Sequence, residues 1–379
     1  MRINILSPGR FHVFYLAKEL SDLGHDVRFY SYVPKKRAVR FGLPEKCSKS
    51  VFGWVLPNLA LIRMFEKTAL SNWAEQFLKW WMDLVVSLSM RPCDVVIAMS
   101  GNFYRSVTKA KKKWSAKVLI ERGSRHILSQ KEILDGVKRL NPKARTVPDF
   151  AVRLELRDYQ IADRIVIPSK HVEQSFYDRG FKPEQLFKNP YGVDVSMFGP
   201  TPFPDEKPTV LMVGGWGYRK GCDLLVEALE STDYRLIHAG PIGDLPFPKT
   251  EKFFDFGFVD QTKLKSIYAK AHIMVLPSRE EGLALVQIQA LACGLPIVCS
   301  DRTGGEDLME YLNNKEMITL VKTDDVLSLR NGIEKAMRFA LAHKESRNSV
   351  LFSSDQLSWK AYGERYNYFL KTLAEAKNE

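Results

Sequence analysis

Short apolar runs alternate with longer amphipathic segments along almost the whole chain. RINIL at residues 2–6 predicts a buried strand, the amphipathic segment at 11–25 a helix, and DVRFYSYV at 26–33 the next strand. Further strand-like runs in the first half lie at 94–99, 117–121 and 164–169. A long series of such strand-helix-strand units predicts a mostly parallel sheet covered by helices on both faces.

The alternation stops at residues 196–208 and then begins again. This stretch, SMFGPTPFPDEKP, has four prolines in thirteen positions and no periodicity, which is typical of an interdomain linker. More strand-like runs follow at 209–215, 235–240, 253–259, 272–278, 296–300 and 317–321. The pattern predicts an α/β protein made of two Rossmann-like domains.

The end of the chain carries one more helical pattern. Trp359, Tyr362, Tyr366 and Phe369 recur at three- and four-residue steps and form one apolar stripe, which we expect to pack at the seam between the domains. The predicted boundaries are residues 1–200 for the first domain, 201–355 for the second and 356–379 for the C-terminal helix.

An aromatic stripe in the first half admits two interpretations. It has helical spacing between residues 61 and 88, with Phe65, Ala69, Trp73, Phe77, Trp80 or Trp81, and Leu84 as its members. Such a stripe is more often core than membrane contact, and we expect it to be buried. The lysine cluster at 109–114 keeps the membrane alternative open, because lysines beside an aromatic residue suit an anionic interface.

Composition narrows the class of protein. With 379 residues and 45% hydrophobic positions, the chain is long enough for two globular domains. Its five cysteines show no metal-ligand spacing, so we expect a reducing environment without a zinc site. No segment predicts a signal peptide or a transmembrane helix, and the expected location is cytoplasmic.

The net charge of +12 is unevenly distributed. Residues 1–208 hold 35 Lys and Arg against 21 Asp and Glu, whereas residues 209–379 hold 21 against 23. The basic first half suggests an anionic partner, such as nucleic acid, acidic lipid headgroups or a phosphorylated acceptor. The alternative is a solvated basic surface that only aids solubility.

Two stretches in the second half combine glycine with charge at predicted strand ends. VGGWGYRKG at 213–221 places Arg219 and Lys220 at the head of a helix, where they could neutralise a diphosphate, although this signal is weak alone. In PSREEGLALVQIQALACGLPIV at 277–298, acidic residues precede a helical run. They could merely stabilise the helix dipole. Glu281 and Gln289, however, are eight residues apart, so both should project from one helical face toward an extended ligand.

At this point the chain resembles a known family, the retaining glycosyltransferases of family four. The family signature has a Glu, seven residues and a second Glu, within a phrase similar to the one at 277–298. Other matching phrases occur in family order: GRFHVFYLAKELSDLGHDV, ADRIVIPS, NPYGVDVSMF, VGGWGYRKGCDLLVEAL, FGFVD and TGGEDL. The resemblance implies a GT-B fold, with two Rossmann-like domains facing each other across a cleft and a C-terminal helix that crosses back to the first domain.

The resemblance also implies roles for individual residues. Glu281 would hold hydroxyls of the donor sugar, and Lys220 matches the lysine that binds the diphosphate. The remaining donor contacts would come from loops at the strand ends: Gly9, Gly215, Gly257, Phe258, Gly282 and Leu283.

Three positions depart from the family pattern. Gln289 replaces the second Glu of the signature and would bind the ribose as an uncharged group. The arginine that usually precedes the lysine is missing, and Arg219 would supply a cation from a neighbouring turn. Arg122 stands where the family has a histidine; it can stabilise a developing negative charge but cannot act as a base, and His126 is the other candidate for that place.

The resemblance implies transfer of a sugar, with retention, from a nucleoside-diphosphate sugar to a sugar or lipid-linked hydroxyl acceptor. The donor nucleotide would be UDP or GDP, with neither metal nor cofactor, and Glu281, Arg122 and Lys220 would form the catalytic set. Surface polysaccharide or glycolipid synthesis is the expected setting, with the basic first domain placed peripherally on the inner membrane face.

Three rival functions come from other classes. A non-catalytic nucleotide-sugar-binding protein is compatible with Gln289 and Arg122. A nucleic-acid binder would explain the basic half, but no stacking motif or recognition helix is visible, and we expect no nucleic acid. An oxidoreductase would need a Gly-x-Gly-x-x-Gly turn, and SPGRFH at the first strand end lacks that spacing.

Overall fold

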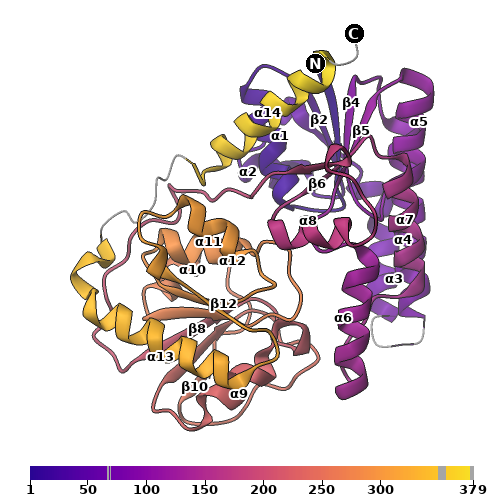
Figure 1. Ribbon diagram of the computed structural model, residues 1–379. Coiled ribbons are helices and arrows are strands. Elements are labelled where there is room, and N and C mark those ends of the chain that lie inside the picture. The colour runs from indigo at the N-terminus through magenta and orange to yellow at the C-terminus, as the bar shows by residue number, and fades with distance from the viewer. Residues whose placement is uncertain (66–67, 69, 349–355, 376–379) are drawn as a thin grey trace.

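Two parallel sheets, each covered by helices, form the molecule (Figure 1). The computed structural model describes residues 1–65, 68, 70–348 and 356–375. Every strand pair in both sheets is parallel, which confirms the predicted α/β class with two Rossmann-like halves.

The first sheet has the strand order β3-β2-β1-β4-β5-β6-β7. Its centre is β1, where Ile3 lies beside Val27 of β2 and Val95 of β4. The bounds are Arg2–Leu6 (β1), Asp26–Ser31 (β2), Ser48–Ser50 (β3), Val95–Met99 (β4), Lys117–Glu121 (β5), Arg164–Ile167 (β6) and Leu186–Lys188 (β7). Helices of this half are His12–Asp22 (α1), Lys35–Arg40 (α2), Phe52–Phe65 (α3), Ser71–Ser89 (α4), Tyr104–Trp114 (α5), Ile127–Leu140 (α6), Asp149–Ile161 (α7) and Lys170–Tyr177 (α8).

The second sheet repeats this topology in the order β10-β9-β8-β11-β12-β13. Its strands are Thr209–Val213 (β8), Arg235–Ala239 (β9), Phe253–Asp255 (β10), Ile273–Leu276 (β11), Ile297–Ser300 (β12) and Ile318–Val321 (β13). Its helices are Cys222–Glu230 (α9), Leu264–Tyr268 (α10), Leu285–Ala292 (α11), Gly305–Leu308 (α12) and Val326–Ala342 (α13). The chain passes between the sheets over residues 189–208, a stretch without helix or strand that includes the expected linker.

The apolar runs coincide with strands because parallel strands covered on both faces are buried along their whole length. All five residues of β8 are buried, as are all four of β11. The sequence analysis missed β3 and β7, which are three-residue strands at the two edges of the first sheet. Edge strands need fewer apolar residues, so Ser48–Ser50 carries no apolar signal.

The C-terminal helix returns to the first half, as the resemblance implied (Figure 1). This helix, α14 (Trp359–Glu375), packs on α1, with the Trp359 ring stacked on Tyr15 at 4.3 Å between centroids. Gly363 allows the close approach, because a Cβ there would lie 2.4 Å from Cβ of Glu19. The predicted helix also included residues 376–379, which lie outside the described residues.

The expectation that the aromatic stripe is buried is wrong for α4. The helix buries Ala74, Leu78, Met82 and Val86 instead. Trp73 and Trp80 are 52% and 50% exposed and stack with Phe77 between them along the outside of the helix. Ala69 lies outside the described residues. No helix in the described part of the chain is long and apolar enough to cross a membrane.

Candidate active site

The two sheets meet along a cleft at the carboxyl ends of their central strands. In each sheet the strand order reverses beside a central strand, between β1 and β4 and between β8 and β11, and open α/β sheets bind ligands at such switch points. A cavity of about 740 Å³ lies there, lined by residues of both halves.

Lys220 and Glu281 form the charged centre of the second-half wall. Lys220 ends a short turn after β8, Glu281 follows β11, and the Lys220 Nζ donates a hydrogen bond to a carboxylate oxygen of Glu281. Gly221 brings the two loops together: its φ is +67°, and a Cβ there would lie 2.2 Å from the carbonyl oxygen of Pro277. A side chain at 221 would therefore separate the pair.

The environment keeps Glu281 ionised. Burial alone would raise its pKa, but the positive charges of Lys220 and Arg219 outweigh burial and lower the pKa to about 2. Glu281 is thus a fixed negative charge near neutral pH. It can accept hydrogen bonds from sugar hydroxyls but cannot serve as a general acid.

The neighbouring carboxylate, Glu280, connects the two halves of the molecule. Glu280 is fully buried and accepts hydrogen bonds from Arg219 Nε at 2.9 Å, from Gln130 Nε2 at 2.9 Å, and from the Ser124 hydroxyl. Ser124 and Gln130 belong to the first half, so Glu280 ties the halves together. Arg219, expected in the donor site, is engaged mainly in this contact and is not among the side chains that line the cavity.

Gln289 lines the cavity, but it does not share a helical face with Glu281 as predicted. Helix α11 begins only at Leu285, so Glu281 lies in the preceding loop, and the two residues do not share a helical face. Both nevertheless line the cavity. The Gln289 side chain is held in place by the Tyr268 hydroxyl, which donates to Oε1 at 3.0 Å.

Arg122 lines the cavity but is firmly held. Its guanidinium pairs with Glu155 at 3.1 Å and donates to Gln130 Oε1 at 2.7 Å and to the Arg125 carbonyl at 2.9 Å. Burial acts to lower its pKa, but Glu155 and nearby anionic groups outweigh burial and raise it. Arg122 is therefore a positioned, permanent cation in the wall of the cavity.

His126 does not line the cavity and instead belongs to the core beside α6. It is 2% exposed, its Nδ1 accepts from the Leu128 amide at 3.3 Å, and its ring packs against Tyr159 and Phe176. Burial, together with Arg179 and Arg122, lowers its pKa to about 4. A neutral helix-capping histidine is a structural element, and of the two candidates only Arg122 lines the cavity.

The loops of the two halves touch where Gly282 meets Gly123. A Cβ on Gly282 would lie 2.0 Å from the Gly123 carbonyl oxygen, so only glycine allows this approach. Ser169 and His171 add contacts from the first half, donating to the Gly282 carbonyl at 2.9 Å and lying 2.8 Å from the Glu281 carbonyl. The Glu281 loop is therefore positioned by both halves.

The cavity also contains residues that the sequence analysis missed. His12, at the start of α1, is 6% exposed and hydrogen-bonds through Nε2 to Glu121 at 2.9 Å, while its ring stacks on Tyr191 at 4.4 Å. Glu121 also accepts from the Tyr366 hydroxyl of α14 at 2.8 Å. Arg10, directly after Gly9, lies across from the second half and donates to Gln261 at 2.7 Å. The only sequence signal for Arg10 and His12 was that they follow the first strand.

The predicted site residues therefore divide into two groups. Those that line the cavity are Arg122, Gly215, Lys220, Phe258, Glu281, Leu283 and Gln289. Those that are placed near it but do not line it are Gly9, Arg219, Gly257 and Gly282, with His126 in the core. Within the described residues, no group of three or more His, Cys, Asp or Glu side chains is arranged to hold a metal ion.

The sequence similarity to known proteins is most direct for the second half of the chain. Residues 196–349 match the family model for glycosyl transferases group 1. The chain is 32% identical over 123 residues to the uncharacterized glycosyltransferase MJ1607 of Methanocaldococcus jannaschii, covering 29% of this chain and 31% of that protein. It is 30% identical over 166 residues to the sulfoquinovosyl transferase SQD2 of Arabidopsis thaliana, covering 39% of this chain and 32% of the relative. The matches thus span about a third of the length of these curated relatives.

Solved structures extend the likeness to the whole chain at the level of fold. The Anabaena protein HepE in complex with UDP-glucose superimposes with a TM-score of 0.65, covering 98% of this chain and 99% of that chain at 14% identity. Residues 196–349 are thus similar to the glycosyl transferases group 1 family, and the two facing parallel sheets have the GT-B fold.

Proposed function

We propose that the protein is a retaining glycosyltransferase that moves a sugar from a nucleoside-diphosphate sugar to a hydroxyl acceptor. The observation that carries this proposal is the Lys220–Glu281 pair in the cavity between the two sheets. A cation for a diphosphate and a carboxylate for sugar hydroxyls lie side by side, as such a donor requires. The family match over residues 196–349 supports the same assignment.

In the proposed reaction, the bond between the anomeric carbon and the diphosphate oxygen breaks, and the acceptor oxygen bonds to that carbon from the same face. The acceptor proton passes to the departing phosphate oxygen, so no protein base is needed. Lys220 and Arg10, both lining the cavity, would stabilise the negative charge on the leaving diphosphate. Arg122, held by Glu155, would add positive charge on the first-half side.

The Lys220–Glu281 pair gives the donor a specific way to bind. A diphosphate takes over the lysine as partner, while the carboxylate turns to accept hydrogen bonds from sugar hydroxyls. Both groups thus remain paired when the donor is bound, which avoids the cost of an unpaired charge in a partly enclosed site.

The first test is a thermal-shift panel with UDP, GDP, ADP and CDP. A ligand at 100 times its dissociation constant stabilises by about 2.7 kcal/mol. We expect UDP to give the largest shift, since the Anabaena structural neighbour was solved with UDP-glucose. Lys220→Ala should abolish the shift, whereas Lys335→Ala on the exposed face of α13 should leave it unchanged. A panel without any shift would contradict the proposal.

The rival function of a non-catalytic nucleotide-sugar binder is separated by turnover. Purified protein that binds UDP-glucose but releases no UDP with any acceptor extract, while a positive-control transferase does, would favour the binder. Release of UDP that depends on both Glu281 and an acceptor supports the enzyme.

We further propose that the first half rests on an anionic membrane surface. Exposed Trp73 and Trp80 on α4 and the lysines of α5 support this partner. Lys111 already pairs with Asp163 at 3.1 Å, so the informative change is Lys112→Glu with Lys113→Glu, both exposed. Sedimentation with anionic vesicles should fall; unchanged sedimentation would exclude these two lysines from the contact.

A further inference from the structure

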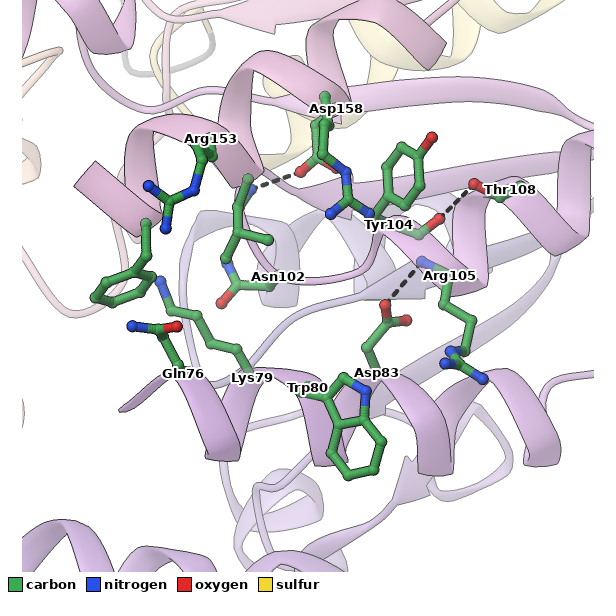
Figure 2. A pocket seen from close by; sticks show the side chains of 14 residues that line it. Gln76, Lys79, Trp80, Asp83, Asn102, Tyr104, Arg105, Thr108, Arg153 and Asp158 are labelled. Carbon is green, nitrogen blue, oxygen red and sulfur yellow. Dashed lines mark hydrogen bonds between the residues drawn. The ribbon is translucent and has the colours of Figure 1, made fainter. Parts of the chain in front are cut away.

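A second cavity lies in the first half, outside the cleft. It measures about 660 Å³ and is enclosed by α4, α5, α7 and the loop after β4 (Figure 2). We call it the α4–α7 pocket. Figure 2 shows Gln76, Lys79 and Trp80 of α4 on one side and Asn102, Tyr104 and Arg153 on the other.

Three arginines of the α4–α7 pocket lack a carboxylate partner. Arg105 of α5 and Arg153 and Arg157 of α7 line it, all three are exposed, and in the described part of the chain none forms an ion pair. The Arg157 guanidinium lies 3.8 Å from the centroid of the Tyr104 ring, which orients it. Arginines with free donors in a pocket match the planar, bidentate geometry of phosphate oxygens.

Two aspartates that line the pocket differ in whether both of their carboxylate oxygens accept hydrogen bonds. Asp83 accepts from the Ser106 hydroxyl at 2.6 Å and from two backbone amides. Asp158 is 1% exposed and accepts from the Gly101 amide at 2.6 Å, but its other oxygen has no hydrogen-bond partner. Burial and nearby Glu155 and Asp83 raise the pKa of Asp158 to about 7. Near neutral pH it can hold a proton and donate it in a hydrogen bond to a ligand oxygen.

The α4–α7 pocket and the cleft share a wall. Ser100 lines the cleft while the next residue, Gly101, lines the pocket. Glu155 lines the cleft, and Asp158, one turn later on α7, lines the pocket. A Cβ on Gly101 would lie 3.0 Å from Cγ of Glu155, so the loop and the helix are in close contact. A ligand in the pocket therefore lies next to the reaction site.

The exposed aromatic row of α4 continues outward from the pocket. Trp80 lines the pocket, stacks on Phe77 at 6.0 Å, and Phe77 stacks on Trp73 at 5.7 Å. Half-exposed indole rings beside a cationic pocket suit a ligand with an anionic head and an apolar chain.

We propose that the α4–α7 pocket binds a phosphate group of the acceptor, held by Arg105, Arg153 and Arg157 with Asp158 as hydrogen-bond donor. The proposal rests on the proposed function, since it assigns the acceptor of that reaction. The phosphate belongs either to a lipid-linked acceptor, whose chain follows the aromatic row, or to a soluble phosphorylated acceptor.

The test measures phosphate binding with the cleft occupied. Inorganic phosphate is titrated calorimetrically into the full chain at saturating UDP, so that the donor site cannot contribute. Arg153→Gln with Arg157→Gln should weaken phosphate binding about 10- to 100-fold, the loss expected for charged hydrogen bonds. The matched control is Lys138→Gln with Arg139→Gln, exposed residues of α6 that remove the same charge, and it should change nothing. Equal binding by both double variants would overturn the proposal.

The two sources are separated with vesicles and the same two double variants. Sedimentation of wild type with phosphatidylcholine vesicles containing phosphatidic acid that is lost with Arg153→Gln and Arg157→Gln, but kept with Lys138→Gln and Arg139→Gln, identifies a lipid-linked acceptor. Phosphate binding without vesicle binding identifies a soluble acceptor. If UDP fails to bind, the titration is repeated without UDP in Lys220→Ala: pocket-dependent binding then survives the loss of the proposed function, and its absence refutes the phosphate site itself.

Discussion

The cations of the cleft and those of the α4–α7 pocket differ in one respect. Lys220 and Arg219 at the cleft are paired with Glu281 and Glu280, whereas Arg105, Arg153 and Arg157 form no ion pair in the described part of the chain. Paired charges hold loops in fixed positions, and their ligand must exchange one partner for another. Unpaired charges contribute a net positive potential that draws anions from solution. The cleft is thus a preformed site whose charges are paired, whereas the α4–α7 pocket attracts anions through its net positive charge.

The largest expected effect concerns the carboxyl group among the unpaired arginines. Asp158 has a pKa of about 7 when folded, against 3.8 when unfolded. Between pH 3.8 and about pH 7 the folded state holds a proton that the unfolded state has lost. The contribution of Asp158 to the free energy of unfolding therefore falls as the pH rises. Over about three pH units the loss approaches roughly 4 kcal/mol. Asp158→Asn should remove this dependence, gaining stability over wild type between pH 4 and pH 8 in urea unfolding; parallel profiles would contradict the burial argument.

Removing the paired cation of the cleft should act on rate instead. Lys220→Met deletes a group that stabilises charge on the leaving diphosphate, and such losses reduce kcat by about 100- to 1000-fold, or about 3 to 4 kcal/mol. Steady-state release of UDP measures it. Arg105→Met, a cation lost from the pocket, should leave turnover of a non-phosphorylated acceptor within about twofold. A similar loss in both variants would end the distinction between the cavities.

Two adjacent glutamates give the sharpest contrast within the cleft. Glu280→Gln weakens a buried contact between the halves and should destabilise by about 1.5 to 3 kcal/mol, the range for hydrogen bonds to charged groups, while keeping the UDP-induced shift. Glu281→Gln leaves Lys220 without its charged partner and so also lowers stability, but it should in addition reduce kcat/KM about tenfold or more. Thermal melts and initial rates on the same two variants decide whether the roles are as assigned or reversed.

The smallest effect is expected where charge is neither paired nor in a cavity. Lys138→Gln on the exposed end of α6 should change the free energy of unfolding by no more than about 0.5 kcal/mol. Urea unfolding at low and high salt checks it. A larger, salt-dependent effect would show that the surface charges of the first half act together rather than locally.

The sequence predicted most of the fold because strands buried on both faces must be apolar. β8 and β11 illustrate this, whereas Ser48–Ser50 was missed because an edge strand of three residues requires no such run. The predicted burial of Trp73 and Trp80 failed for a related reason. Helical spacing shows that residues share a face but does not say which face meets the core, and in α4 Ala74 and Leu78 take that place.

The candidate site was predictable in the second half and much less so in the first. Lys220 and Glu281 lie in local motifs at strand ends, and the fold brings such ends to one edge of the sheet. His12 with Glu121, and Arg122 with Glu155, join segments far apart in the chain, and one sequence carries no signal for such pairs. The helical-face argument for Glu281 and Gln289 reached a correct location through an incorrect geometry, because α11 begins after Glu281.

The contact between Gly282 and Gly123 limits which substitutions this sequence can accept. The space for a Cβ at 282 is occupied by a carbonyl oxygen at 2.0 Å, so any replacement must push the two halves apart. At Gly257, φ is +62° and nothing lies within 4 Å of the added atom, so the restriction there is conformational only, and asparagine meets it at modest cost. In a library randomised at both codons, we expect functional clones to keep glycine at 282 and to accept asparagine at 257. The mutational tolerance of each glycine would then report whether its constraint comes from the opposite half or from its own backbone.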